Sequence, residues 1–128
     1  MIESAGCTVL TMALRRLGTI AGLTGAYEVS PVQALVPYVE VEVGAEREWG
    51  HKSGDGREIR LAMLFHDKGE RSVRLRQFMS EAEERLGSAA LDGDWQLVSL
   101  SFVRSQIVRN GAGWMGMLEY RARLLRRS

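Results

Sequence analysis

Apolar residues at helical spacing define two segments of the chain. From Ser4 to Leu17 they recur every three or four positions, and Gly18 follows as a natural end to a helix. Between Gly69 and Gly87, one side of the helical pattern is apolar and the other is charged. The apolar positions there are Leu75, Phe78, Met79, Ala82 and Leu86. We therefore expect two amphipathic helices.

Alternating apolar and polar residues predict strands over much of the remaining chain. A short strand is expected at 26–29, and a longer one follows Pro37 over 38–43, where valines alternate with glutamates. Residues 59–65 are apolar on both faces, as in a central strand. The last two strands are expected at 98–103 and 114–124. In the former, the pattern places Val98, Leu100 and Phe102 on one face.

The order of these elements predicts an α+β fold. We expect a two-layer sandwich: a mostly antiparallel or mixed sheet of about four to five strands, with two helices on one face. The 128 residues, 45% of them hydrophobic, suffice for a single core, so we expect one domain over 1–128. There is no apolar run near the ~20 residues of a membrane span, and we expect a soluble protein that is not secreted.

The segment from Gly44 to Arg57 is polar and rich in turn-forming residues, which predicts a long, exposed hairpin connection. Trp49 has no obvious core to join there, and both a partner interface and packing within the chain are open interpretations. The candidate partner contacts are Glu46, Arg47, Glu48, Trp49, Lys52 and Asp55. Met115 and Met117 lie on the polar side of the last strand, where they are candidates for a subunit interface.

No catalytic, cofactor or metal motif is found in the sequence. His51, His66 and the single Cys7 do not have the spacing of a zinc site. The glycine pairs at 54–56 and 111–113 are not followed by a helix that could receive a phosphate, so hairpin turns explain them. Glu40 and Glu42 fit a solvated strand face without a nucleophile beside it. We expect neither an enzyme nor a cofactor.

The formal net charge of the chain is only +1, which argues against a broad basic face that binds nucleic acid. The basic residues are fifteen arginines and only two lysines. Arginine suits bidentate pairs at interfaces better than lysine does, although a coding bias explains the ratio equally well. The C-terminal cluster of Arg121, Arg123, Arg126 and Arg127 is interpreted as a solvated strand edge in preference to a binding patch.

Several short patterns occur in an ordered series along the chain. A Pro-Tyr pair opens a strand, a tryptophan precedes a polar stretch that ends in Asp-Gly, and the last strand has the pattern Trp-x-Gly-x-apolar-x-aromatic-Arg. The residues are Pro37, Tyr38, Trp49, Asp55, Gly56, Phe102, Trp114, Gly116, Tyr120 and Arg121. This series resembles the tail-completion, or tail-terminator, proteins of long-tailed phages and gene-transfer agents. Residues 30–36 depart from it, because they are more apolar than the family's usual connection.

The resemblance implies a structural virion protein at the tail-neck junction, assembled in the host cytoplasm. Such proteins form a ring, commonly of six copies, that caps the tail tube, ends tail elongation and joins the head connector. The implied partners are other copies of the chain, the major tail tube protein and a connector protein. DNA would pass through the ring without recognition of its sequence. The alternatives are another head-tail neck component and, from a different class, a small ligand-binding α+β module.

Overall fold

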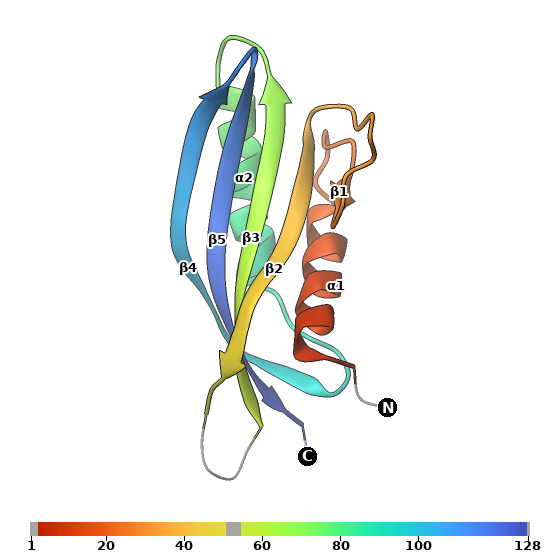
Figure 1. The fold of residues 1–128 in the computed structure, drawn as a ribbon, viewed down its shortest axis with the longest axis vertical. Helices are drawn as coiled ribbons and strands as arrows, with labels where there is room; N and C mark the ends of the chain where they lie inside the picture. The colour runs from red at the N-terminus through yellow and green to blue at the C-terminus, as the bar shows by residue number, and fades with distance from the viewer. Residues whose placement is uncertain (1–2, 51–54, 128) are drawn as a thin grey trace.

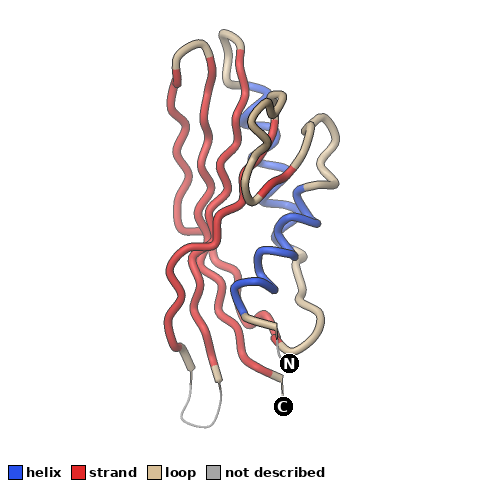
Figure 2. Tube along the Cα trace, turned by 45° about the vertical axis from the view of Figure 1, so that its right-hand side comes forward, coloured by secondary structure: helices blue, strands red, loops and turns tan. Residues whose placement is uncertain are grey.

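The fold in the computed structural model is a two-layer α+β sandwich (Figure 1). The structure describes residues 3–50 and 55–127. Helices α1 (Ala5–Leu17) and α2 (Val73–Gly87) lie on the same face of one sheet (Figure 2). The strands are β1 (Ala26–Tyr27), β2 (Tyr38–Glu48), β3 (Gly56–Lys68), β4 (Trp95–Asn110) and β5 (Gly113–Arg126).

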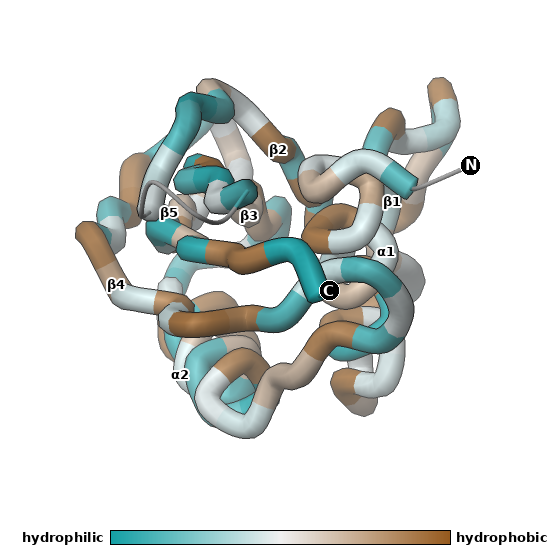
Figure 3. Tube along the Cα trace, turned by 90° about the horizontal axis from the view of Figure 1, so that it is seen from below, coloured by the Kyte–Doolittle hydropathy of each residue, from teal (hydrophilic) through white to brown (hydrophobic). Residues whose placement is uncertain are grey.

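The five strands follow the spatial order β1-β2-β3-β5-β4. The short β1 runs parallel to β2, and every other neighbouring pair is antiparallel. The mixed sheet with two helices on one face confirms the predicted fold class. β3 and β5 are central, whereas β1 and β4 form opposite edges, as the view along the long axis shows (Figure 3).

Both helices form where the apolar spacing predicts them. Ser4 is the N-cap of α1, and its hydroxyl accepts a hydrogen bond from the Cys7 amide at 3.0 Å. All five predicted apolar positions of α2 are buried against the sheet. Neither helix of the described residues has the length and apolar composition needed to cross a membrane.

The core lies between the helices and one face of the sheet, which we call the helix face. β3 and β5 contribute alternate residues to it, as expected for central strands. α2 approaches β5 closely at Gly116, where an added Cβ would overlap the sulfur of Met79 and lie 3.3 Å from Leu75. The strand members of the core with least exposure are Val39, Val41, Ile59, Leu61, Met63, Phe65, Leu118, Ala122 and Leu124.

The prediction of a long loop from Gly44 to Arg57 is wrong at both ends of this segment. β2 continues to Glu48 and β3 already begins at Gly56. A register shift between Val43 and Glu46 lets β2 continue past its apolar alternation. Ion pairs across the two strands then satisfy the charged side chains, so a segment that is polar on both faces still forms a ladder.

The predicted alternation in β4 is only partly right. Leu100 and Phe102 both lie on the helix face, where their cross-strand partners are Ala122 and Tyr120. Val98 does not belong to this series. The register shifts between Leu97 and Ser99 and again between Phe102 and Arg104. Each shift inserts one unpaired residue, and a bulge changes which face the following side chains reach.

Candidate functional site

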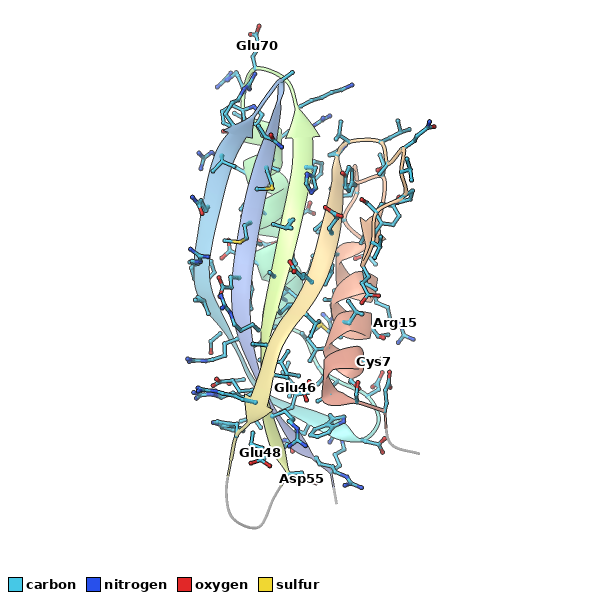
Figure 4. All side chains as sticks on the ribbon, in the orientation of Figure 1. Cys7, Arg15, Glu46, Glu48, Asp55 and Glu70 are labelled. Atoms are coloured by element: carbon cyan, nitrogen blue, oxygen red, sulfur yellow. The ribbon has the colours of Figure 1, made fainter. Side chains whose placement is uncertain are left out.

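The β2–β3 hairpin end holds most of the residues predicted to contact a partner. Glu46, Glu48 and Asp55 gather at one end of the molecule (Figure 4). The first two belong to β2, together with Arg47. Lys52 and His51 lie outside the described residues. The hairpin therefore presents these charges on a paired strand end, which holds them in a fixed order.

The charges at this end are divided between the two faces of the sheet. The Arg57 guanidinium lies 3.4 Å from the Glu46 carboxylate, on the side of the helices. The Arg47 side chain points to the other face and donates to Glu58 at 2.6 Å. The Arg47 side chain stays largely exposed, at 74%. A partner at this end would meet both signs of charge.

Trp49 is half-buried at the end of β2. Its amide donates to the Gly56 carbonyl at 3.0 Å, which closes the hairpin. The Arg123 guanidinium lies over its ring, 5.3 Å from the centroid. Trp49 thus combines packing within the chain with a remaining exposed surface, and both interpretations from the sequence stay open.

The second candidate region is the sheet face that carries no helix, which we call the open face. The strand registers place the odd-numbered residues 115–125 of β5 on it, beside the even-numbered residues 58–66 of β3. Met115 and Met117 are both half-buried there. Leu64 is the cross-strand partner of Met117, and His66 is the partner of Met115. The two predicted interface methionines therefore lie together on an uncovered face.

A buried glutamate is the centre of a charge network on the open face. Glu119 is only 4% exposed. Its carboxylate accepts hydrogen bonds from Arg60 on one neighbouring strand and from Arg104, at 2.8 Å, on the other. Both arginine side chains are 59% exposed. The network thus holds two guanidinium groups outward on either side of β5.

Glu58 repeats this arrangement nearer the hairpin. Its carboxylate accepts from Arg47 at 2.6 Å and from Arg123 at 2.9 Å. These two hydrogen bonds hold the pKa of Glu58 below its usual value, against the opposing effect of burial. Arg121 lies 3.8 Å from the same carboxylate, but its buried Nε has no hydrogen-bond partner. Five arginines surround two glutamates, so this part of the open face carries net positive charge.

The open face is hollowed beside Glu119. The hollow has a volume of about 220 Å³, and Met117 forms part of its wall with the aliphatic residues Ala45 and Ala62. The charged lining residues are Glu42, Arg60, Arg104 and Glu119. The hollow thus combines short aliphatic side chains and a methionine with charges of both signs, a composition that suits a protein-protein contact.

The remaining candidate chemistry is a histidine-carboxylate pair. His66 Nε2 lies 2.7 Å from Glu40 Oε1, and the imidazole stacks on Tyr38 with ring centroids 4.7 Å apart. In residues 3–50 and 55–127 no three histidine, cysteine or acidic residues are grouped as metal ligands would be. The pair joins β2 to β3 on the open face.

Sequence reasoning missed the arginine network. Arg121 and Arg123 are not at a solvated strand edge, because β5 lies between β3 and β4. They face inward along the open face toward Glu58. The signal was present in the alternation of β5, which puts Glu119, Arg121 and Arg123 on one face. The partners on β3 and β4 required the strand order.

Comparison with solved structures finds a fold match over nearly the whole chain. A chain in the structure described as "Virion of native gene transfer agent (GTA) particle" matches with a TM-score of 0.68 and 19% sequence identity. The match covers 96% of this chain and 99% of that one. No protein-family model and no curated protein sequence matches. At this identity the likeness establishes a shared fold.

Proposed function

We propose that this protein is a structural component of a phage or gene-transfer-agent virion. The main support is the likeness in fold to a chain of a gene-transfer-agent particle, because it covers both chains almost completely. The open face supports the same proposal, since its hollow combines apolar side chains with exposed arginines, which suits contact with another protein.

Within the virion, we propose that the protein is a tail terminator. One copy of 1–128 is a single domain, and several copies, six by the resemblance to tail terminators, form a ring that caps the tail tube. The ordered series of patterns from Pro37 to Arg121 supports this role. The partners are the major tail tube protein and a head-tail connector protein, and DNA passes through the ring without base recognition.

The hairpin end provides the proposed anchor to the tube or to a neighbouring subunit. Trp49 supplies a partly exposed aromatic surface, and Glu46, Arg47, Glu48 and Asp55 provide charges of both signs around it. Lys52, outside the described residues, belongs to the same proposed contact. Binding energy at interfaces concentrates in tryptophan and arginine side chains surrounded by polar residues.

The test is removal and replacement of the gene in a host that produces the particle. Without it, we expect tails of uncontrolled length that have no heads under negative-stain microscopy, and wild-type protein should restore normal particles. Trp49→Ala should fold but fail to restore them, whereas Val73→Ala, at an exposed apolar position on α2, should restore them. Normal tails without heads attached would instead indicate a connector. Normal particles in the absence of the gene would contradict any virion role.

A further inference from the structure

Exposed large apolar side chains cluster in two places at opposite edges of the sheet. One is the connection between β1 and β2, where Val32 is completely exposed. The other is the edge strand β4. Their members are Val29, Val32 and Leu35 in the connection, which we call the apolar loop, and Val98, Phe102 and Val103 on β4. β1 and β4 lie on opposite sides of the molecule when it is viewed along its long axis (Figure 3).

The outer edge of β4 is long and lacks a strand neighbour in the described part of the chain. β4 has 16 residues, whereas the other edge strand, β1, has two. An unpaired edge of this length is a ready surface for association. Val98 and Val103 are the extra residues at the two register shifts, and each is about half exposed. The bulges therefore add apolar side chains to an edge that already has free backbone groups.

Charge differs between the two edges in a complementary way. At one edge, residues 26–37, which include β1 and the apolar loop, contain one glutamate and no basic residue. At the other edge, β4 contains two arginines and no acidic residue. Contact between like edges of two copies would bring charges of the same sign together, whereas contact between unlike edges would bring opposite charges together.

We infer that copies of this chain associate head to tail, with the apolar loop of one copy against the β4 edge of the next. This inference rests on the proposed ring function and names the surfaces that would join its subunits. Two different patches at opposite edges make a heterologous contact, which repeats from copy to copy until a ring closes. The apolar residues provide the buried area, and the acidic and basic edges select the unlike pairing.

Cross-linking tests the direction of the contact. In a Cys7→Ser background, cysteines replace Val32 and Val103, singly and together, and a short bismaleimide is added. The double variant should give a ladder of covalent oligomers, and a mixture of the two single variants should give dimers only. Neither single variant alone should cross-link. The matched control is a double variant that carries Val73→Cys and Val103→Cys, because Val73, on α2, is also exposed, at 46%. It should remain monomeric.

Several results would overturn the inference. Efficient dimers from the Val32→Cys variant alone would indicate a contact between like edges. Equal ladders from the Val73 control would indicate random collision, and the absence of a ladder at every protein concentration would show that these edges do not meet.

A charge placed in the apolar loop provides the second test. Val32→Lys should weaken self-association at least about tenfold by analytical ultracentrifugation, because it puts an ammonium group into an apolar contact that faces the basic β4 edge. Val73→Lys should leave association unchanged, and circular dichroism should show both variants folded. Unchanged association of Val32→Lys would overturn the inference. The particle assay separates this inference from the proposed function. If the charged variant caps tails normally and its self-association is unchanged, the two named edges are wrong but the ring function stands. If tails are capped normally even when the gene is deleted, the ring function itself is refuted.

Discussion

Replacing Gly56 by alanine should destabilise the hairpin end of the sheet. An added Cβ would overlap the carbonyl oxygen of Trp49 and lie 2.6 Å from its carbonyl carbon. Both contacts are with backbone atoms, so a change of side-chain rotamer cannot relieve them. The two strands must separate at this point.

The cost follows from the contacts that strand separation would break. Trp49 donates to the Gly56 carbonyl at 3.0 Å, and Arg126 donates through its amide to the Asp55 carbonyl at 2.8 Å. Each hydrogen bond contributes about 0.5–1.5 kcal/mol, and the Arg123 contact with the Trp49 ring adds about 0.5–1 kcal/mol. We expect a loss of about 1.5–4 kcal/mol, which for a chain of this size lowers Tm by roughly 6–16 °C.

Thermal unfolding followed by circular dichroism measures this loss, and amide hydrogen exchange locates it. Exchange should accelerate at the amides of Trp49 and Arg126 and stay slow in the central strands. Gly87→Ala is the matched control, because an added Cβ at this end of α2 meets no atom within 4 Å. It should stabilise the protein by at most about 1 kcal/mol. An unchanged Tm for Gly56→Ala would refute the close approach of the two strands on which the reasoning depends.

Three further predictions concern contacts outside the hairpin. Gly116→Ala should lower the free energy of unfolding in urea by about 1–3 kcal/mol, because the added Cβ overlaps Met79. The double variant that also carries Met79→Ala should lose less than the sum of the two single losses. Additive losses would contradict the contact. The hydrogen bond from Arg74, with the Lys68 amide, holds the pKa of Asp67 below its usual value, so the stability from this carboxylate is present above about pH 4 and is lost as the pH falls through the lowered pKa. Asp67→Asn should therefore reduce stability at neutral pH and flatten its acid dependence, and an acid profile as steep as that of wild type would count against this. Glu119→Gln should lower the free energy of unfolding by about 1–3 kcal/mol, because it weakens two charge-assisted hydrogen bonds to a buried group; a change below about 0.5 kcal/mol would show that the arginines do not depend on it.

The sequence by itself determined the parts of this fold that depend on local periodicity. The α1 pattern predicted Ser4–Leu17, and the helix runs from Ala5 to Leu17 with Ser4 as its cap. The apolar spacing in α2 predicted which of its residues are buried, and the patterns at 59–65 and 114–124 predicted the strands β3 and β5. These elements were predictable because a helix or central strand must bury each apolar side chain at its own repeat.

Only the tertiary structure decided how far β2 extends. The segment after Val43 has no apolar alternation, and its polar composition is that of a loop. It forms a strand because Glu46 and Arg47 find partners on β3, at Arg57 and Glu58. Such pairs depend on register, which the composition of one segment does not specify. The same reason explains the two bulges in β4 and the failure of its predicted alternation.

The candidate surfaces divide in the same way. Alternation alone placed Met115 and Met117 on the polar side of β5, and the structure puts them on the open face beside β3. The strand order then decided what surrounds them, because β5 lies between β3 and β4 instead of at an edge. That order brings Arg60 and Arg104, distant in sequence, to the Glu119 carboxylate. A single strand's pattern fixes which way its side chains point, and only the packing of several strands fixes what they meet.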